Sequence, residues 1–572
     1  MANDNFRNKL SKYLNKDKGK ITILSISAIA SITLKVIAVF IFGDTINSFV
    51  QFADEYGLLK NFIIIILLWL ISIGLHWYSE YNAIAISNNV IDKVKCDTYR
   101  YLQLLSIENF KKMNIIDVTN VFTKDYLRIN KFLSFSLLDL LTSSFAVLSS
   151  IILSLFIDFR ITITIILGIC ITFALFYALR KVNKDKILNH RKANNNLDTY
   201  INDTLLNLKI IKSRYEEKEH ILKFHDLNNS LYVTRTAVDF MNESLFSFIR
   251  YIIFAIILIS IYILGMSLSL YFLNVGYIIN VILLATLLFR PINNVIQVFK
   301  EYPNVVKAIE NIDFIYSIKD TIKNSDDAKT IEALSGAINF ENVSYSIKNK
   351  KLISDINLEI KSGEKIALLE KEPLGIYALI NILERFYLNN GGKIKVDGNY
   401  ISDIKIDSFR NRLGYIEHET RLFSGTIKDN ILVGKTTATD EEVMLAAKFA
   451  NLHDFIMTLK DNYDTEITPE TTMFTKAQKK LIGFARVFLK NPDIIIIEED
   501  KPTSIIQDEL SVQNAIDNIT KNKTSLIVAN TKKTVKTASR VIVFDNGKIV
   551  EDGNHEGLIG KVGPYTKIYN SL

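Results

Sequence analysis

The chain has 572 residues, which is enough for two or more domains, and carries a formal net charge of +7. Hydrophobic residues make up 49% of it and its mean hydropathy is +0.18. The apolar runs lie almost entirely before residue 300, which excludes a wholly soluble protein. We attribute the positive charge to basic loops of a membrane protein and expect no nucleic-acid partner. The two isolated cysteines, Cys96 and Cys170, indicate neither a disulfide framework nor a metal site.

Six apolar runs approach or reach the length that spans a bilayer. They are Ile21–Gly43, Phe62–Trp77, Leu137–Ile157, Ile161–Leu179, Ser247–Leu270 and Phe272–Phe289. The first run is expected to be a retained helix, because no small-residue cleavage site follows it. An even number of spans returns both termini to one side, and the loops rich in lysine and arginine indicate that this side is the cytoplasm. We therefore expect a multi-pass protein of the cytoplasmic (inner) membrane, surrounded by membrane lipid.

Two long inner loops have helix-forming composition and almost no glycine or proline. We expect helices to continue beyond the bilayer there, so that the loop ends near Phe110–Asp117 and Ile211–Tyr215 meet whatever lies below the membrane. Two basic residues, Lys35 and Arg250, fall inside apolar runs. A charge within a membrane segment indicates function by default. Lys35 is a candidate for lining a polar cavity, whereas Arg250 is close enough to its helix end to reach the interface.

The character of the chain changes after Pro303. Residues Asp313–Ser335 are charged and polar, as is typical of a linker, and from Ile338 onward short β-rich segments alternate with helical ones. This alternation predicts an α/β domain with a largely parallel sheet. The β-rich segments are Lys365–Leu369, Lys393–Val396, Arg412–Ile416, Asp493–Glu498, Thr524–Ala529 and Val541–Asp545. We expect a transmembrane domain at 1–312, a linker at 313–335 and a second domain at 336–572.

A broken phosphate-binding loop follows the strand that ends at Leu369. The pattern G-x-x-x-x-G-K-[ST] needs two glycines, a lysine and a hydroxyl group. Here Gly375 remains, but Glu370 replaces the first glycine, Ile376 the lysine and Tyr377 the hydroxyl residue. Two unit charges about 4 Å apart interact by about 4 kcal/mol at an effective dielectric constant of about 20. Because Glu370 and its neighbour Glu372 add two carboxylates and the lysine is lost, we expect the affinity for MgATP to fall at least about a thousandfold.

The whole chain resembles a half-transporter of the ATP-binding cassette (ABC) exporter family. The segments that carry the resemblance, in the family's order, are Phe340-Glu-Asn-Val-Ser-Tyr345, Lys393-Ile-Lys-Val-Asp-Gly398, Leu422-Phe-Ser-Gly-Thr-Ile427, Asn491-Pro-Asp-Ile-Ile-Ile-Ile-Glu-Glu499 and Gly547-Lys-Ile-Val-Glu-Asp-Gly-Asn-His-Glu556. The resemblance implies a multidomain membrane protein. A six-helix α transmembrane domain of the ABC exporter type would be followed by an α/β P-loop-NTPase-like ABC domain.

The resemblance also implies where the ATP-site motifs of the family fall. The signature Leu-Ser-Gly-Gly-Gln maps onto Phe474-Thr-Lys-Ala-Gln478, so Thr475, Lys476 and Gln478 would face a nucleotide on a partner subunit. The other positions are Ile347 for the adenine-stacking aromatic, His418 for the Q-loop glutamine, Glu498 for the Walker B aspartate, Glu499 for the general base and Asn530 for the switch histidine. Glu499 is the only catalytic residue kept, and a purely structural role at the end of a buried strand fits it equally well.

These replacements predict a degenerate nucleotide-binding domain that binds no MgATP at its own loop and is inactive by itself. Our first hypothesis is a non-catalytic subunit of a heterodimeric exporter of a peptide, a lipid or an amphipathic small molecule. A second half-transporter with intact motifs would then share MgATP with this chain. The alternative is a pseudo-transporter that serves as a membrane scaffold, regulator or immunity protein. Loss of the signature favours the alternative, whereas the apparently intact six-helix domain favours the exporter.

Overall fold

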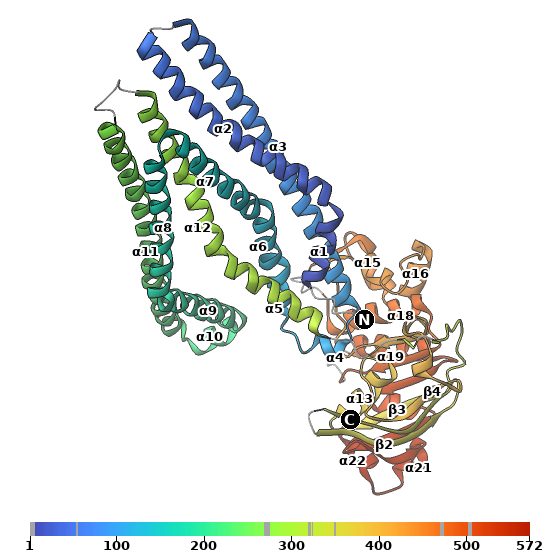
Figure 1. The fold of residues 1–572 in the computed structure, drawn as a ribbon. Helices are drawn as coiled ribbons and strands as arrows, with labels where there is room; N and C mark the ends of the chain where they lie inside the picture. Colours follow the sequence, from blue (N-terminus) through green and yellow to red (C-terminus); the bar gives the residue numbers. More distant parts are fainter. Residues whose placement is uncertain are drawn as a thin grey trace. The chain divides into compact units, whose positions relative to one another are not determined.

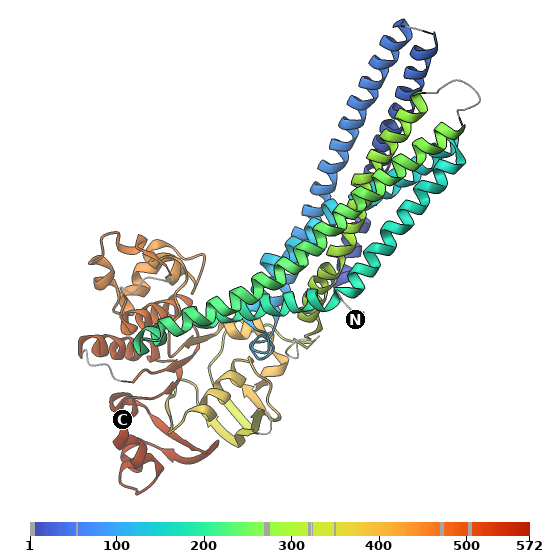
Figure 2. The same ribbon diagram turned by 90° about the vertical axis from the view of Figure 1, so that its left-hand side faces the viewer.

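The computed structural model describes residues 6–52, 55–267, 275–318, 322, 324–325, 327–347, 350–468, 474–501 and 506–572. Their contacts divide the chain into two compact units. One unit comprises Met1–Gln103 and Asn114–Ile318, and the other comprises Leu104–Met113 and Lys319–Leu572. Figure 1 and Figure 2 show the elements of both units from two sides.

The first unit is helical throughout its described residues. Its longer helices are α1 (Phe6–Lys16), α2 (Lys18–Phe52), α3 (Glu55–Leu104), α7 (Leu137–Ile157), α8 (Phe159–Val182), α9 (Lys184–Leu206), α11 (Glu217–Ser267) and α12 (Val275–Ser317). Among the described residues, six helical spans are long and apolar enough to cross a membrane, and the described part of each predicted run falls on one of them, which confirms the six-span prediction. The predicted turn near Tyr271 lies outside the described residues.

Short helices complete this unit. Helices α5 (Ile115–Asn120) and α6 (Tyr126–Lys131) lead into α7 through π-helical turns, and α10 (Leu208–Arg214) lies between α9 and α11. The helices therefore continue well beyond the apolar runs, as the composition of the inner loops predicted.

Helices α8, α11 and α12 pack through a stripe of β-branched and aliphatic side chains. On α11 the buried positions Ile249, Ile253 and Ile256 recur at helical spacing. Gly168 on α8 allows the close approach, because a Cβ atom there would lie 2.2 Å from Cδ1 of Ile256. Helix α12 also packs against α2 and α7, so it contacts both sides of the bundle.

Two sheets form the framework of the second unit. The antiparallel sheet has the order β2-β1-β4-β5, with β1 at Ile338–Ile347, β2 at Lys350–Ile360, β4 at Gly391–Val396 and β5 at Asn399–Tyr400. The central sheet has the order β12-β11-β3-β10-β9-β6 and is parallel except for β12. Its strands are β3 (Lys365–Glu370), β6 (Leu413–Ile416), β9 (Ile494–Glu498), β10 (Thr524–Val528), β11 (Arg540–Asp545) and β12 (Lys548–Gly553). The predicted, largely parallel sheet is confirmed.

Helices cover both faces of the central sheet. Side chains alternate along a strand, so Ile494 and Ile496 of β9 join one apolar core while Ile495 and Ile497 join the other. The first core includes α13 (Leu374–Leu383), and the second includes α18 (Lys476–Lys490). The remaining elements are α14 (Ile406–Asn411), β7 (Gly425–Thr426), α15 (Ile427–Leu432), α16 (Asp440–Phe449), α17 (His453–Met457), β8 (Glu466–Ile467), α19 (Ile506–Thr520), α20 (Lys532–Thr537), α21 (His555–Ile559) and α22 (Pro564–Ser571).

Two features differ from the boundaries expected from composition. Helix α12 continues to Ser317, past the expected start of the linker at Asp313, because Ile315 and Tyr316 are buried. The segment Leu104–Met113, with the short helix α4 (Ile107–Phe110), clusters with the second unit although it was expected within 1–312. The first inner loop thus meets the second unit near Phe110, as predicted.

Candidate functional site

Most of the predicted site residues meet at one edge of the central sheet. The parallel strands β3, β10, β9 and β6 are neighbours, so their carboxyl ends lie at the same edge. Glu370 ends β3, Asn530 follows β10, Glu498 ends β9, Glu499 comes directly after it, and His418 follows β6. Ile347, the expected adenine-stacking position, ends β1 and is 44% exposed.

The Glu370 side chain occupies the loop between β3 and α13. Its Oε2 accepts the N–H of Gly375 at 3.0 Å and the N–H of Ile376 at 3.1 Å. These N–H groups open α13, where the helix dipole favours a negative charge. A Cβ atom on Gly375 would lie 2.9 Å from Oε1 of Glu370, so the glycine permits the carboxylate to approach. Burial raises the pKa of Glu370, and these N–H bonds oppose that rise.

The two residues at the lysine and hydroxyl positions belong to the core of the domain. Ile376 is fully buried in the apolar cluster that holds α13 against the sheets, and Tyr377 packs against the same cluster. Burial raises the pKa of Tyr377, and the nearby carboxylates of Glu498 and Asp500 raise it further. The phenol therefore stays neutral at physiological pH.

The Glu499 carboxylate is buried and surrounded by hydrogen-bond donors. Its Oε1 accepts from Gln513 Nε2 at 2.5 Å, Thr534 Oγ1 at 2.7 Å and Thr531 Oγ1 at 2.8 Å. Its Oε2 accepts the N–H groups of Asn530 at 2.8 Å and Thr531 at 3.0 Å. Burial raises the pKa of Glu499, and the hydrogen bonds counter this effect. The side chain thereby joins the end of β9 to α19 and to the start of α20.

Asn530 and His418 also have partners within the chain. Asn530 Nδ2 donates to the carbonyl oxygen of Glu499 at 2.6 Å. His418 Nδ1 lies 2.9 Å from Oδ1 of Asp500, and its N–H donates to Oε2 of Glu498 at 3.1 Å. The other oxygen of Glu498 accepts from Tyr415 Oη at 2.5 Å, and this bond adds to burial in raising the pKa of Tyr415.

Lys480 reaches the same edge from α18 and is 2% exposed. Its Nζ donates to the carbonyl oxygens of Glu417 and Glu498, each at 2.5 Å, and lies 3.3 Å from Oδ2 of Asp500. Burial lowers the pKa of Lys480, whereas Asp500 opposes that change. This lysine is the main polar link between α18 and the strand end at Glu498.

The residues at the signature position begin α18. Thr475 Oγ1 accepts the N–H of Gln478 at 3.2 Å while Gln478 Oε1 accepts the N–H of Thr475 at 2.9 Å, which is a capping box. Thr475 Oγ1 also donates to Oδ2 of Asp508 at 3.0 Å. Lys476 is exposed and lines a cavity of about 400 Å³ with His418 and Asp500. The sequence had assigned Lys476 to a partner's nucleotide, and here it also lines a cavity of its own chain.

Sequence reasoning missed the residues that satisfy the carboxylates. They are Tyr415, Lys480, Gln513, Thr531 and Thr534. One signal was available, since Lys480 lies on the stripe of α18 that carries Ala477, Leu481 and Phe484, where a lysine is unexpected. Among the described residues there is no group of three or more His, Cys, Asp or Glu side chains that suits a metal ion.

Comparisons with known proteins agree with this architecture. Residues 21–292 match the family model of the ABC transporter transmembrane region, and residues 353–504 match the ABC transporter model. A "Putative multidrug export ATP-binding/permease protein" of Staphylococcus aureus (strain NCTC 8325 / PS 47) is 30% identical over 502 residues, which cover 86% of this chain and 85% of that protein. A protein of the same description from the bovine strain RF122 / ET3-1 is 29% identical with the same coverage.

A solved structure shows the same fold. It is described as a bacterial Atm1-family ABC exporter with ATP bound, and its TM-score is 0.82 at 18% identity, with 96% of this chain and 97% of that chain covered. The chain therefore belongs to the ABC transporter family, as a half-transporter of the exporter type with one transmembrane region and one ABC domain. Half-transporters of this family dimerise, and their ABC domain lies in the cytoplasm.

The Lys480 contacts predict a stability effect. Replacing Lys480 with Met should destabilise the ABC domain by about 3 kcal/mol, because the carbonyl oxygens of Glu417 and Glu498 and the carboxylate of Asp500 lose their donor. For a domain of this size the loss corresponds to a fall in Tm of about 6–12 °C. Differential scanning calorimetry of the full chain in detergent measures it. The matched control is Lys479→Met, since the neighbouring lysine makes none of these bonds. Equal Tm values for the two variants would contradict the structural role of Lys480.

Proposed function

We propose that this chain is a degenerate, non-catalytic subunit of a heterodimeric ABC exporter in the cytoplasmic membrane. The partner supplies an intact phosphate-binding loop, and the cargo is a peptide, a lipid or an amphipathic small molecule. The observation that carries the proposal is the contact between Glu370 and the N–H groups of Gly375 and Ile376. N–H groups at such a helix start are the usual ligands of a nucleotide phosphate. In this chain its own carboxylate takes that place.

The residues at the loop do not fit MgATP. A phosphate would have to displace the Glu370 carboxylate and would then remain beside a repelling negative charge. The lysine of the family's loop is missing from its position, where Ile376 is buried in the apolar core. Tyr377 offers a bulky phenol, packed against the core, in place of the small hydroxyl group that holds magnesium. All three effects oppose binding, so we infer that no nucleotide binds at this loop.

The surroundings of Glu499 support the same conclusion. A general base needs an oxygen that faces the water from which it takes a proton. Glu499 is 3% exposed, and its two oxygens already accept five hydrogen bonds within the domain. We therefore assign Glu499 to holding β9, α19 and α20 together, which was one of the two roles that the sequence allowed.

Exposed apolar side chains on the second inner loop support a dimer. In and beside α10, Leu206 is 79% exposed, Ile210 is 53% exposed and Tyr215 is 85% exposed. These residues follow the predicted cytoplasmic end of an apolar run, so lipid does not account for their exposure. A contiguous exposed apolar surface usually marks a protein contact. We infer that a second subunit of the same family covers this exposed surface, because half-transporters of this family dimerise.

One observation favours the alternative, a pseudo-transporter that acts as a scaffold or regulator. The Thr475 hydroxyl is used by the capping box and by Asp508, whose carboxylate would repel a γ-phosphate at this helix start. If the signature helix cannot face a nucleotide, then neither composite site of a dimer is complete. Isolation of the complex distinguishes the exporter subunit from the scaffold.

Purification of the tagged chain from its native membrane in mild detergent tests whether the chain has a second half-transporter as its partner. We expect a second six-helix subunit, with an intact G-x-x-x-x-G-K-[ST] loop, in equal amount by quantitative mass spectrometry. Recovery of this chain alone, or with a soluble enzyme, would contradict the heterodimer and favour the scaffold.

Rebuilding the loop tests the role of Glu370. The triple variant Glu370→Gly, Ile376→Lys and Tyr377→Ser should bind MgATP in equilibrium dialysis of the full chain, because the two N–H groups become free and a lysine is supplied. Ile376→Lys alone should not bind. The matched control replaces Glu372 instead of Glu370 together with the same two changes, and should not bind either. Tight binding by the unmodified chain or by this control would contradict the proposed blockade.

Lys476 tests the composite site of the heterodimer. Lys476→Glu should lower the ATPase rate of the purified complex several-fold, because it places a negative charge at a helix start that would face the partner's nucleotide. Lys548→Glu, a charge reversal in the exposed strand β12, is the control. An unchanged rate with Lys476→Glu would place α18 outside the active site.

A further inference from the structure

A pocket of about 280 Å³ lies in the first unit, among α8, α9, α11 and α12. Part of its wall is apolar, since it contains Phe176 and Leu179 of α8, which also pack against the cluster that joins α8, α11 and α12. Another part carries three cations, Arg180 on α8, Arg191 on α9 and Lys300 on α12. The other lining residues are Ile187, His190, Val238, Met241 and Asn304. We refer to this pocket as the interface pocket.

None of the three cations forms an ion pair with a carboxylate of the described residues. Arg180 Nη1 donates to the carbonyl oxygen of Phe299 at 3.1 Å, and Arg191 Nη2 donates to Oδ1 of Asn304 at 2.9 Å. Lys300 forms no hydrogen bond within the described part of the chain. Because a guanidinium group has five N–H donors, both arginines keep donors for a ligand.

The interface pocket lies at the cytoplasmic boundary of the membrane. Arg180 directly follows the apolar run Ile161–Leu179, at the predicted cytoplasmic end of α8. Its bond to the carbonyl oxygen of Phe299 places the neighbouring Lys300 at the same level. On α11, Met241 comes shortly before an apolar run begins. The three helices thus agree on a level at which the hydrocarbon ends and lipid headgroups begin.

Nearby carboxylates do not balance the charge of the interface pocket. Glu243 acts electrostatically on Lys300, and Asp239 is paired with Arg235 at 3.6 Å. The exposed charged residues that flank the pocket on the same helices are Lys181, Lys184, Lys186, Lys192 and Lys307, together with Asp185 and Glu301. Positive charge remains in excess when all of these residues are counted, so the pocket attracts an anion.

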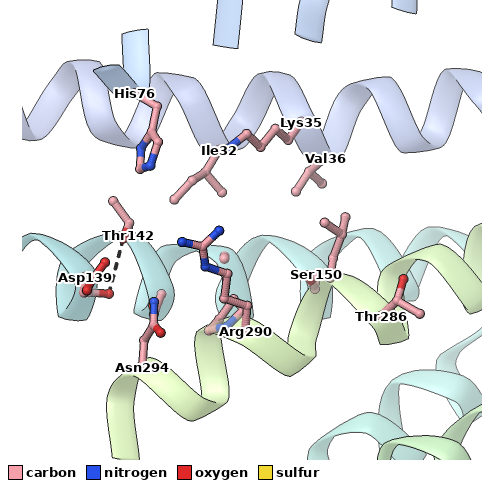
Figure 3. Close-up of a pocket in the computed structure, with 14 residues that line it drawn as sticks. Ile32, Lys35, Val36, His76, Asp139, Thr142, Ser150, Thr286, Arg290 and Asn294 are labelled. Carbon is pink, nitrogen blue, oxygen red and sulfur yellow. Dashed lines mark hydrogen bonds between the residues drawn. The ribbon is translucent and has the colours of Figure 1, made fainter. Parts of the chain in front are cut away.

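The cavity in Figure 3 provides a contrast. It has a volume of about 240 Å³, lies among α2, α3, α7 and α12, and is lined by Lys35, the membrane-segment charge that the sequence proposed for a polar cavity. Figure 3 shows the Arg290 guanidinium pointing toward the helix of Lys35. Asp139 also lines this cavity, and Oε1 of Glu80 lies 3.2 Å from Nε2 of His76. With His76 neutral, the two carboxylates balance the two cations, so no excess charge selects an anion there.

We propose that the interface pocket binds a phosphate ester, supplied by the headgroup of an anionic phospholipid in the cytoplasmic leaflet. Basic pockets between membrane helices on this side bind such headgroups. Arg180, Arg191 and Lys300 surround the phosphate. His190 supplies a further polar atom, because its Nδ1 is enclosed and has no hydrogen-bond partner among the described residues. Phe176, one turn nearer the bilayer centre than Arg180, lies beside the lipid's hydrocarbon part.

The bound lipid has a structural role in this proposal. Its phosphate joins cations from α8, α9 and α12, so binding stabilises the packing of these helices. The lipid is a resident component and not the exported cargo. Its binding requires neither ATP nor a partner subunit, and the proposal therefore goes beyond the proposed function.

Differential scanning calorimetry of the delipidated full chain in dodecyl maltoside tests the binding. Phosphatidylglycerol at about a hundredfold above its Kd should raise the Tm by several degrees, and phosphatidylcholine with the same acyl chains should not. Lys300→Gln should weaken phosphatidylglycerol binding by about tenfold in a native mass spectrometry titration, because a charged donor is lost. The control is Lys181→Gln, since Lys181 is exposed at the same membrane level but does not line the pocket.

Asn304→Asp separates lipid binding from folding. The new carboxylate keeps the acceptor for Arg191 and forms an ion pair with it, so the Tm without lipid should not fall. The same carboxylate offsets one cation of the pocket and repels a phosphate. The rise in Tm with phosphatidylglycerol should therefore shrink, which a misfolded variant would not show in this combination.

Glycerol phosphate distinguishes the two sources of the phosphate ester. A rise in Tm with phosphatidylglycerol and none with glycerol phosphate identifies a lipid headgroup, whereas equal rises identify a soluble phosphate ester. An equal response to phosphatidylcholine, an equal loss of affinity with Lys181→Gln, or an undiminished response of Asn304→Asp would overturn the proposal. Absence of any response to either phosphate ester would also overturn it. None of these results bears on nucleotide binding, so failure here leaves the proposed function intact.

Discussion

Buried carboxylates at the edge of a parallel sheet must find hydrogen-bond donors, and this requirement organises the ABC domain. A buried charge without partners costs several kcal/mol. Glu370 takes two N–H groups of the helix start, Glu498 takes the Tyr415 hydroxyl, and Glu499 takes five donors from the segments around it. These donors all come from the chain itself.

The same contacts explain how the fold persists after so many replacements. Ile376 adds to the apolar core where the family has a lysine, and Tyr377 packs against that core, so α13 remains fixed to the sheets. Lys480 donates to carbonyl oxygens on two strand ends and holds α18 in place. Each of these side chains thus makes a contact within the domain.

Much of the fold could be predicted from the sequence. The features that could not be predicted depend on contacts between distant parts of the chain. The six spans and the parallel sheet follow from hydrophobic runs and periodicity, which report directly on burial. The motif positions follow from order and spacing, which is why Glu370 and Glu499 were found. Their donors were not found, because Gln513 and Thr534 are far along the chain and the contact depends on how α19 and α20 pack. The extension of α12 to Ser317 was missed because its buried residues alternate with charged ones.

A contact made by the first inner loop helps to distinguish the two proposed roles, a transporter subunit and a scaffold. In the second unit, Lys111 Nζ donates to Tyr387 Oη at 2.9 Å, and the Tyr387 ring stacks on Tyr345 with ring centroids 5.6 Å apart. Lys111 belongs to the segment Leu104–Met113, which clusters with the ABC domain, and Tyr387 follows α13, the helix after the loop that begins with Glu370. A scaffold has no need for a contact at this place, whereas a transporter subunit needs one to pass movement from its ABC domain to its helices. The contact therefore favours the proposed transporter subunit over the proposed scaffold.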